Sequence, residues 1–215
     1  MVSPCIFSLV YAQRLKGYSQ CFYTFGAYPG IMRELSDRNI LDGFCEKFCG
    51  IVDTHCRYII VSGFVAISSG RVRGTEDIDL IIERLSKEQL EALHHDLIDA
   101  GFVCMQSASV DEIFSYLKDN LAVRYTLGDK PLPEMEMKFA KDALDNEQLQ
   151  LRTKLPLTGI DIWFGSIPMN IAFKEELLKS DKDLKDAEHL RKVYPELADE
   201  REIFRLKVLI RRIRL

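Results

Sequence analysis

Long apolar runs, zinc-type cysteine pairs and glycine-rich nucleotide loops are all missing from this chain of 215 residues. No apolar stretch reaches the roughly 20 residues that a membrane-spanning helix needs, which predicts a protein without membrane contact. The chain also has no GxxxxGK phosphate loop and no GxGxxG dinucleotide fingerprint. The ordinary P-loop and Rossmann nucleotide sites are therefore not supported.

The cysteines show neither the CxxC spacing of a zinc site nor the density of a secreted disulfide scaffold. The six are Cys5, Cys21, Cys45, Cys49, Cys56 and Cys104. We expect reduced thiols in a cytoplasmic protein. Cys45 and Cys49 are four residues apart on an expected helix over residues 33–53, but no two further ligands accompany them, so core packing is the better interpretation.

Composition and charge are those of an ordinary soluble globular protein. The chain is 47% hydrophobic and 29% charged, with a net charge of -4 and a pI near 5.7. These values argue against a protein built mainly to coat nucleic acid, although they leave room for a local basic patch. The length fits one domain with appendages.

Acidic residues are absent from Met1–Ile31, where only Arg14 and Lys16 carry a charge. No positive charge precedes the apolar part of this segment and no small-residue cleavage site follows it, so a secretory signal peptide is not favoured. The absence of acids is typical of a transit peptide, whereas the low arginine content is not. We expect Met32 to be the natural start, or Met1–Ile31 to be a loosely attached extension.

The stretch Tyr58–Glu83 organises the rest of the chain, and its sequence is YIIVSGFVAISSGRVRGTEDIDLIIE. Asp77 and Asp79 are two residues apart in a strand-like run, and successive strand side chains alternate faces, so both acids point the same way. Their Cα atoms are expected about 7 Å apart, a spacing at which the two carboxylates can share a Mg²⁺ ion.

A phosphate-binding turn is expected just upstream of these acids. An apolar strand ends at Val61, and a helix is expected to begin at Phe64 after Ser62 and Gly63. Gly63 allows the backbone to approach a ligand closely, and the free N–H groups of a helix N-terminus favour phosphate.

The stretch Tyr58–Glu83 resembles the signature of the DNA polymerase beta nucleotidyltransferase superfamily, a glycine turn and helix followed by a strand with Asp-x-Asp. GRVRGTEDIDLII is similar, more narrowly, to minimal nucleotidyltransferase-like proteins, a group that includes AbiEii-type toxins. Met135–Asp145 and Ala172–Leu190 resemble later blocks of this group. Ser62 departs from the pattern, because it stands where the family usually has its first glycine.

The resemblance implies a third acid on a later strand beside the Asp-x-Asp strand. Met135–Phe139 alternates like a strand and lies within a family-like block, so Glu136 fits that place. Its side chain is one methylene longer than the usual Asp. Asp161, in a strand-like run after the Thr158–Gly159 turn, is the rival.

The fold that the resemblance implies is α/β (α+β), a mixed twisted sheet flanked by helices. Residues 32–165 would form the nucleotidyltransferase core and residues 166–215 a C-terminal helical segment. The implied reaction moves a nucleoside monophosphate from an NTP, ATP included, to an acceptor. Asp77, Asp79 and Glu136 would hold Mg²⁺, while the nucleotide site would contain Ser62, Gly63, Arg73, Thr75, Lys174 and Lys182.

Partners and an alternative function follow from the same residues. The expected last helix, Asp199–Leu215, is rich in Arg and Lys, which either complement the helix dipole or bind RNA or a nucleotide phosphate. The acceptor is left open between RNA, a protein and a small molecule. The alternative is a nucleotide-binding module or toxin–antitoxin component that keeps the fold without the chemistry, which Ser62 and Glu136 favour.

Overall fold

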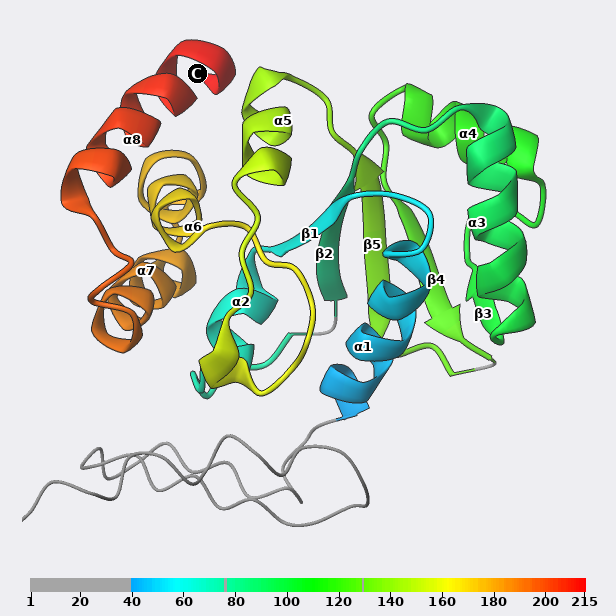
Figure 1. The fold of residues 1–215 in the computed structure, drawn as a ribbon, viewed down its shortest axis with the longest axis horizontal. Coiled ribbons are helices and arrows are strands. Elements are labelled where there is room, and N and C mark those ends of the chain that lie inside the picture. The colour runs from blue at the N-terminus through cyan, green and yellow to red at the C-terminus, as the bar shows by residue number, and fades with distance from the viewer. Residues whose placement is uncertain (1–39, 76, 129) are drawn as a thin grey trace, which may run out of the picture. The chain divides into compact units, whose positions relative to one another are not determined.

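A mixed β-sheet forms the centre of the part of the chain that the computed structural model describes, residues 40–75, 77–128 and 130–215 (Figure 1). The expectations for Met1–Ile31 and for a start at Met32 lie outside these residues. Within them the sheet has five strands, in the order β1 (Tyr58–Val61), β2 (Asp77–Ile82), β5 (Glu134–Phe139), β4 (Val123–Leu127) and β3 (Phe102–Cys104). The β2–β5 pair is parallel and the other neighbours are antiparallel.

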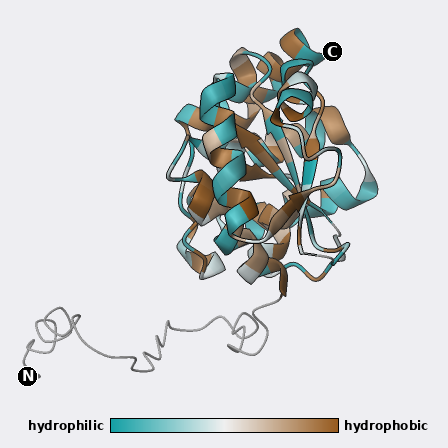
Figure 2. Cartoon of the chain, turned by 90° about the vertical axis from the view of Figure 1, so that its right-hand side faces the viewer, coloured by the Kyte–Doolittle hydropathy of each residue, from teal (hydrophilic) through white to brown (hydrophobic). Residues whose placement is uncertain are grey.

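One face of the sheet is buried under three amphipathic helices. These are α1 (Ile40–Val52), α3 (Lys87–Asp99) and α4 (Val110–Lys118). Leu80 and Met137 of the strands belong to the same buried cluster as Phe48 and Leu93 of the helices. The ribbons alternate between hydrophobic and hydrophilic residues, as amphipathic helices do (Figure 2).

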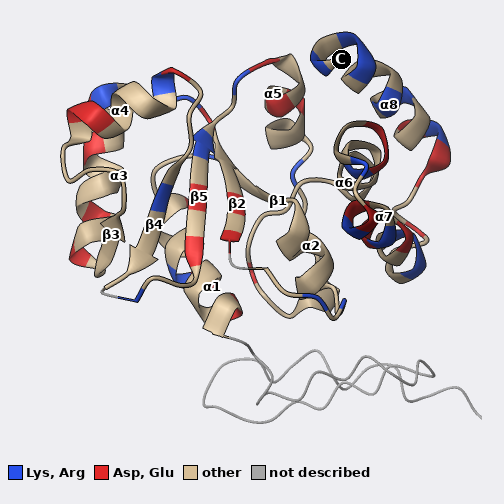
Figure 3. Cartoon of the chain, turned by 180° about the vertical axis from the view of Figure 1, so that it is seen from behind, with Lys and Arg blue, Asp and Glu red and all other residues tan. Residues whose placement is uncertain are grey.

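The other face is covered only in part. Helix α5 (Ala143–Gln150) closes a small cluster in which Leu149 packs with Ile59 and Ile81 of the sheet. Further along the same strands the side chains are charged rather than apolar. Acidic residues lie side by side on β2 and β5, with basic residues on β4 and near the end of β5 (Figure 3).

The C-terminal helices lie beyond β1, on the opposite side from α3 and α4 (Figure 1). Together with α2 (Gly63–Ser68), the elements here are α6 (Ile167–Phe173), the π-helical turn η3 (Lys174–Leu178), α7 (Asp181–Val193) and α8 (Glu200–Arg214). Helix α7 packs on α2, and α8 packs on α6 and α5. None of the helices in the described ranges is long and apolar enough to span a bilayer.

Most expected elements are present, and the exceptions have physical causes. The capping box of Ser86 at the start of α3 is confirmed. A second capping box at Ser109 is wrong, because the Ser109 side chain makes no cap hydrogen bond. Helix α5 was not expected. Its buried side contains the polar Asp145 and Gln148 beside its leucines, so its sequence shows no apolar stripe. The segment around Asp161 forms only isolated bridges with its neighbours.

Candidate functional site

Four carboxylates share one face of β2 and β5, and we call them the acidic face: Asp77, Asp79, Glu134 and Glu136. In the parallel register Asp77 is the partner of Glu134 and Asp79 is the partner of Glu136. Side chains that are partners in register point to the same side of a sheet, and adjacent strands are about 4.8 Å apart. The strand pairing therefore brings Glu136 beside Asp79, as the expected order of acids required.

Two cations from the same sheet compensate part of this charge. Arg124 of β4 lies 2.7 Å from Glu136 and 3.2 Å from Glu134, and Lys138 of β5 lies 3.5 Å from Asp79. Both cations are partly exposed. Sequence reasoning did not assign either to the site, although the alternation of β5 places Lys138 on the face of Glu136.

The surroundings of Asp79 disfavour its charged form. Burial raises its pKa, and the nearby negative charges of Glu136 and Asp77 add to the rise. Lys138 and a hydrogen bond from the Ser62 hydroxyl act in the opposite direction. A carboxylate in this setting gains from any additional positive charge brought close to it.

Thr75 orients the first acid rather than facing the pocket. Its hydroxyl lies 3.0 Å from a carboxylate oxygen of Asp77 and 3.0 Å from the Asp77 backbone carbonyl. The expectation for Thr75 was nucleotide binding, and its contacts in this structure are with Asp77.

The turn between β1 and α2 is tightly built. Ser62 has a φ of 65°, a conformation that non-glycine residues adopt rarely and at a cost. Gly63 is buried, and a Cβ atom on it would meet Nη2 of Arg73 at 2.9 Å. A side chain at this position would have to displace the guanidinium of Arg73.

Behind this turn lies a group of cations around one acid, which we call the cation cluster: Arg71, Arg73, Lys174 and Asp186. Asp186 of α7 is fully buried, and it pairs with Arg73 at 2.5 Å, with Lys174 at 2.8 Å and with Arg71. Asp183 lies 3.6 Å from Lys174. Burial lowers the pKa of Lys174 to about 8; Arg73 and Arg71 add to this, whereas Asp183 opposes it.

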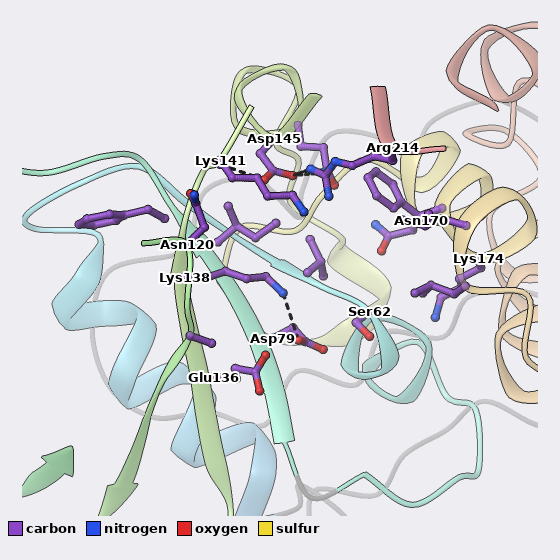
Figure 4. Close-up of a pocket in the computed structure, with 18 of the residues that line it drawn as sticks. Ser62, Asp79, Asn120, Glu136, Lys138, Lys141, Asp145, Asn170, Lys174 and Arg214 are labelled. Atoms are coloured by element: carbon purple, nitrogen blue, oxygen red, sulfur yellow. Dashed lines mark hydrogen bonds and ion pairs between the residues drawn. The ribbon is translucent and has the colours of Figure 1, made fainter. Parts of the chain in front are cut away.

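A pocket of about 460 Å³ lies between part of the acidic face and Lys174 of the cation cluster (Figure 4). Asp79, Glu136 and Lys138 lie on its sheet side, while Ser62 and Lys174 line it on the side of the turn and the C-terminal helices. Cavities of this size accept ligands as large as a nucleotide. The arrangement offers a ligand both negative and positive groups.

Six of the expected site residues do not line this pocket: Gly63, Arg73, Thr75, Asp77, Asp161 and Lys182. Asp161, the rival third acid, has a side chain that is 96% exposed and pairs with Lys154 at 2.9 Å. Lys182 is exposed on α7, where its backbone carbonyl accepts a hydrogen bond from Arg71. Neither side chain lines the pocket among the described residues.

The carboxylates of the acidic face do not close into a metal cage by themselves. Across the described ranges, no three His, Cys, Asp or Glu side chains are grouped so that they could hold a metal ion. Mg²⁺ is commonly held by one or two carboxylates together with substrate phosphates, so oxygen donors at Asp79 and its neighbours suit this ion.

The basic residues of α8 are engaged within the chain. Four of them pair with acids of other elements or of the same helix: Arg205 with Glu147 and Glu202, Lys207 with Glu175, Arg211 with Glu176, and Arg214 with Asp142 and Asp145. Sequence alone suggested a choice between the helix dipole and RNA. These contacts show a third use, which is to attach α8 to the rest of the fold.

No protein-family model matches the sequence, and no curated protein is significantly similar to it. Solved structures do share its fold. An antigenic nucleotidyltransferase-like protein from Paracoccidioides brasiliensis aligns with a TM-score of 0.50 and 19% identity, over 80% of this chain and 88% of its own. The chain thus has the fold of a nucleotidyltransferase-like protein, as the sequence predicted.

Two structures of the antibiotic-resistance factor ANT(2'')-Ia also align. One is a solution structure, with a TM-score of 0.49 and 19% identity over 80% of this chain and 91% of that one. The other is a complex with adenylyl-2''-tobramycin, with a TM-score of 0.47 and 20% identity over 81% and 98%. The narrower likeness to AbiEii-type proteins stays a prediction.

Proposed function

We propose that the protein transfers a nucleoside monophosphate from an NTP to an acceptor and releases pyrophosphate. One observation carries this proposal: a single pocket has carboxylates on its sheet side and a lysine of the cation cluster on the other. A metal-bound nucleoside triphosphate carries charges of both signs and matches such a pocket.

The acidic face would hold the metal. Asp77, Asp79 and Glu136 are the residues that would bind Mg²⁺, which neutralises charge on the phosphates and lowers the pKa of an attacking hydroxyl when bound. Thr75 keeps Asp77 oriented through its hydroxyl. Lys138 would have to release Asp79 for this carboxylate to serve a cation, which the partial exposure of Lys138 allows.

The turn and the cation cluster would hold the phosphates. Ser62 and Lys174 line the pocket, Gly63 follows Ser62 in the turn, and the Arg73 guanidinium lies beside Gly63. In the reaction the acceptor hydroxyl oxygen bonds to the α-phosphorus while the bond to the departing pyrophosphate breaks. Positive groups near the turn stabilise the charge that the pyrophosphate carries away.

A transfer assay with a matched control tests this function. The protein is incubated with each radiolabelled NTP, Mg²⁺, and either total RNA or cell extract, so that RNA, proteins and small molecules are all offered as acceptors. We expect Asp77→Asn combined with Asp79→Asn to reduce transfer at least about 100-fold, the scale of losing a preorganised charge in an active site. Asp161→Asn removes an exposed carboxylate outside the pocket and should transfer as wild type does.

The transfer assay, combined with a binding measurement, distinguishes the proposed function from the alternative, a nucleotide-binding module without chemistry. Two observations favour that alternative: the strained Ser62 in the turn, and the pairing of Glu136 with Arg124. A protein that binds NTP and Mg²⁺ by calorimetry but labels no acceptor is a binding module. A protein that does neither rejects both functions.

A further inference from the structure

Asp186 is a buried acid surrounded by cations from two different parts of the chain. Arg71 and Arg73 come from the segment after α2, and Lys174 comes from the first residue of η3. Asp186 itself is fully buried in α7, and the Lys174 side chain is only 1% exposed. Cations this close repel one another, so the arrangement depends on the carboxylate between them.

The position of Arg73 shows what this arrangement does. One guanidinium nitrogen, Nη1, is held by Asp186 at 2.5 Å, while Nη2 lies against the backbone of Gly63. Nη2 has no hydrogen-bond partner among the described residues, so it keeps a donor free beside the Ser62–Gly63 turn. Arginine offers its donors in a rigid plane, and fixing one edge of that plane fixes the direction of the other.

We propose that Asp186 is a positioning residue for a pyrophosphate-type anion, because it holds Arg73 and Lys174 beside the Ser62–Gly63 turn. The proposal deepens the proposed function and rests on it for the identity of the ligand, the β- and γ-phosphates of an NTP. The buried carboxylate does not touch the anion. It acts through the two cations: Lys174 lines the pocket, and Nη2 of Arg73 lies beside Gly63 of the turn.

The direction of one change in affinity distinguishes positioning from a simple charge effect. If Asp186 acted only as a negative charge near an anion, Asp186→Asn would remove repulsion and tighten binding. If Asp186 positions the cations, the same variant loses the two strong charge-assisted contacts and binding weakens. Asp183→Asn is the matched control, since it removes a carboxylate 3.6 Å from Lys174 without touching Arg73.

The experiment measures binding of inorganic pyrophosphate to the full chain by calorimetry, in buffer without an NTP. We expect the Kd to rise at least tenfold in Asp186→Asn and to stay equal or fall in Asp183→Asn. An unchanged or tighter Kd in Asp186→Asn overturns the proposal, as does an equal weakening in both variants or a wild type that does not bind pyrophosphate.

A second variant keeps the test informative if Asp186→Asn does not fold. Arg73→Lys retains the positive charge but loses the planar group that spans Asp186 and Gly63, so its Kd should also rise at least tenfold. Wild-type affinity in Arg73→Lys contradicts positioning. Because pyrophosphate binding needs no transfer, a wild type that binds pyrophosphate but transfers no nucleotide rejects the proposed function and leaves the role of Asp186 standing.

Discussion

The acidic face gathers negative charges that are partly exposed, whereas the cation cluster gathers positive charges around a buried acid. On the acidic face, four carboxylates meet two cations, all on strands of one sheet and all partly exposed. In the cation cluster, three cations from a loop and a π-helical turn meet the buried Asp186 of helix α7. Exposed charges remain hydrated when no ligand is bound, whereas buried charges must be neutralised inside the protein.

The largest expected effect is the loss of stability in Asp186→Asn. Removing one partner of a buried ion pair leaves an uncompensated charge, here on Lys174, which is only 1% exposed. We expect the free energy of unfolding to fall by about 3 to 5 kcal/mol. Urea unfolding at pH 7 measures it, with exposed Asp161→Asn as the control that should change nothing. A loss below about 1 kcal/mol would show that water or a neighbour already compensates the cluster.

Alkaline pH should weaken the cation cluster by removing the charge of Lys174. The pKa of Lys174 is lowered to about 8 by burial, so this lysine is mostly protonated at pH 7 and mostly neutral at pH 9. The charged residues that face it are Arg71, Arg73, Asp183 and Asp186. We expect the Kd for pyrophosphate to rise about tenfold between pH 7 and pH 9, the loss expected when the neutral form does not bind.

Lys174→Arg is the control for this pH effect, because a guanidinium keeps its charge through pH 9. Its affinity should not fall over the same interval. Pyrophosphate itself becomes more negative as pH rises, which would tighten binding, so a wild-type Kd that falls contradicts a role for Lys174.

The smallest expected effect is a gain in stability when charge is removed from the acidic face. On the acidic face, like charges on paired strands destabilise one another, so Asp77→Asn with Asp79→Asn should raise the free energy of unfolding by up to about 1 kcal/mol. The sign is opposite to that of Asp186→Asn for the same chemical change. Urea unfolding at pH 7 checks it, and a loss of more than about 1 kcal/mol would mean that Thr75 and Lys138 depend on these carboxylates for order.

Three acids of the acidic face were expected from the sequence, because the spacing of residues along a strand fixes which face they share. Glu134, the fourth, was not expected. Asp77 and Asp79 were expected to share a face, and Glu136 was expected on a neighbouring strand. The register that places Glu136 beside Asp79 follows from alternating apolar residues, which must all face the core. The fold itself was also within reach, since the strands and the helices of one face carry regular apolar patterns.

The cation cluster was not predictable, because it depends on packing between distant elements. The sequence around Asp186 is highly charged and resembles a solvated helix, and only the contact of α7 with α2 decides that Asp186 is buried while Lys182 is exposed. No local pattern distinguishes these two residues strongly. A resemblance drew attention to Lys174 but not to its partner.

The parallel pairing of β2 with β5 has a consequence for how the acidic face comes into being. Parallel neighbours need a long crossover, and here the chain between the two strands includes α3, β3, α4 and β4. The carboxylates therefore meet only after most of this intervening chain has folded, when the packed core can hold them together against their repulsion. The complete acidic face needs β2 and β5 paired, so the metal-dependent nucleotide binding that we propose should appear during refolding only after these strands have met.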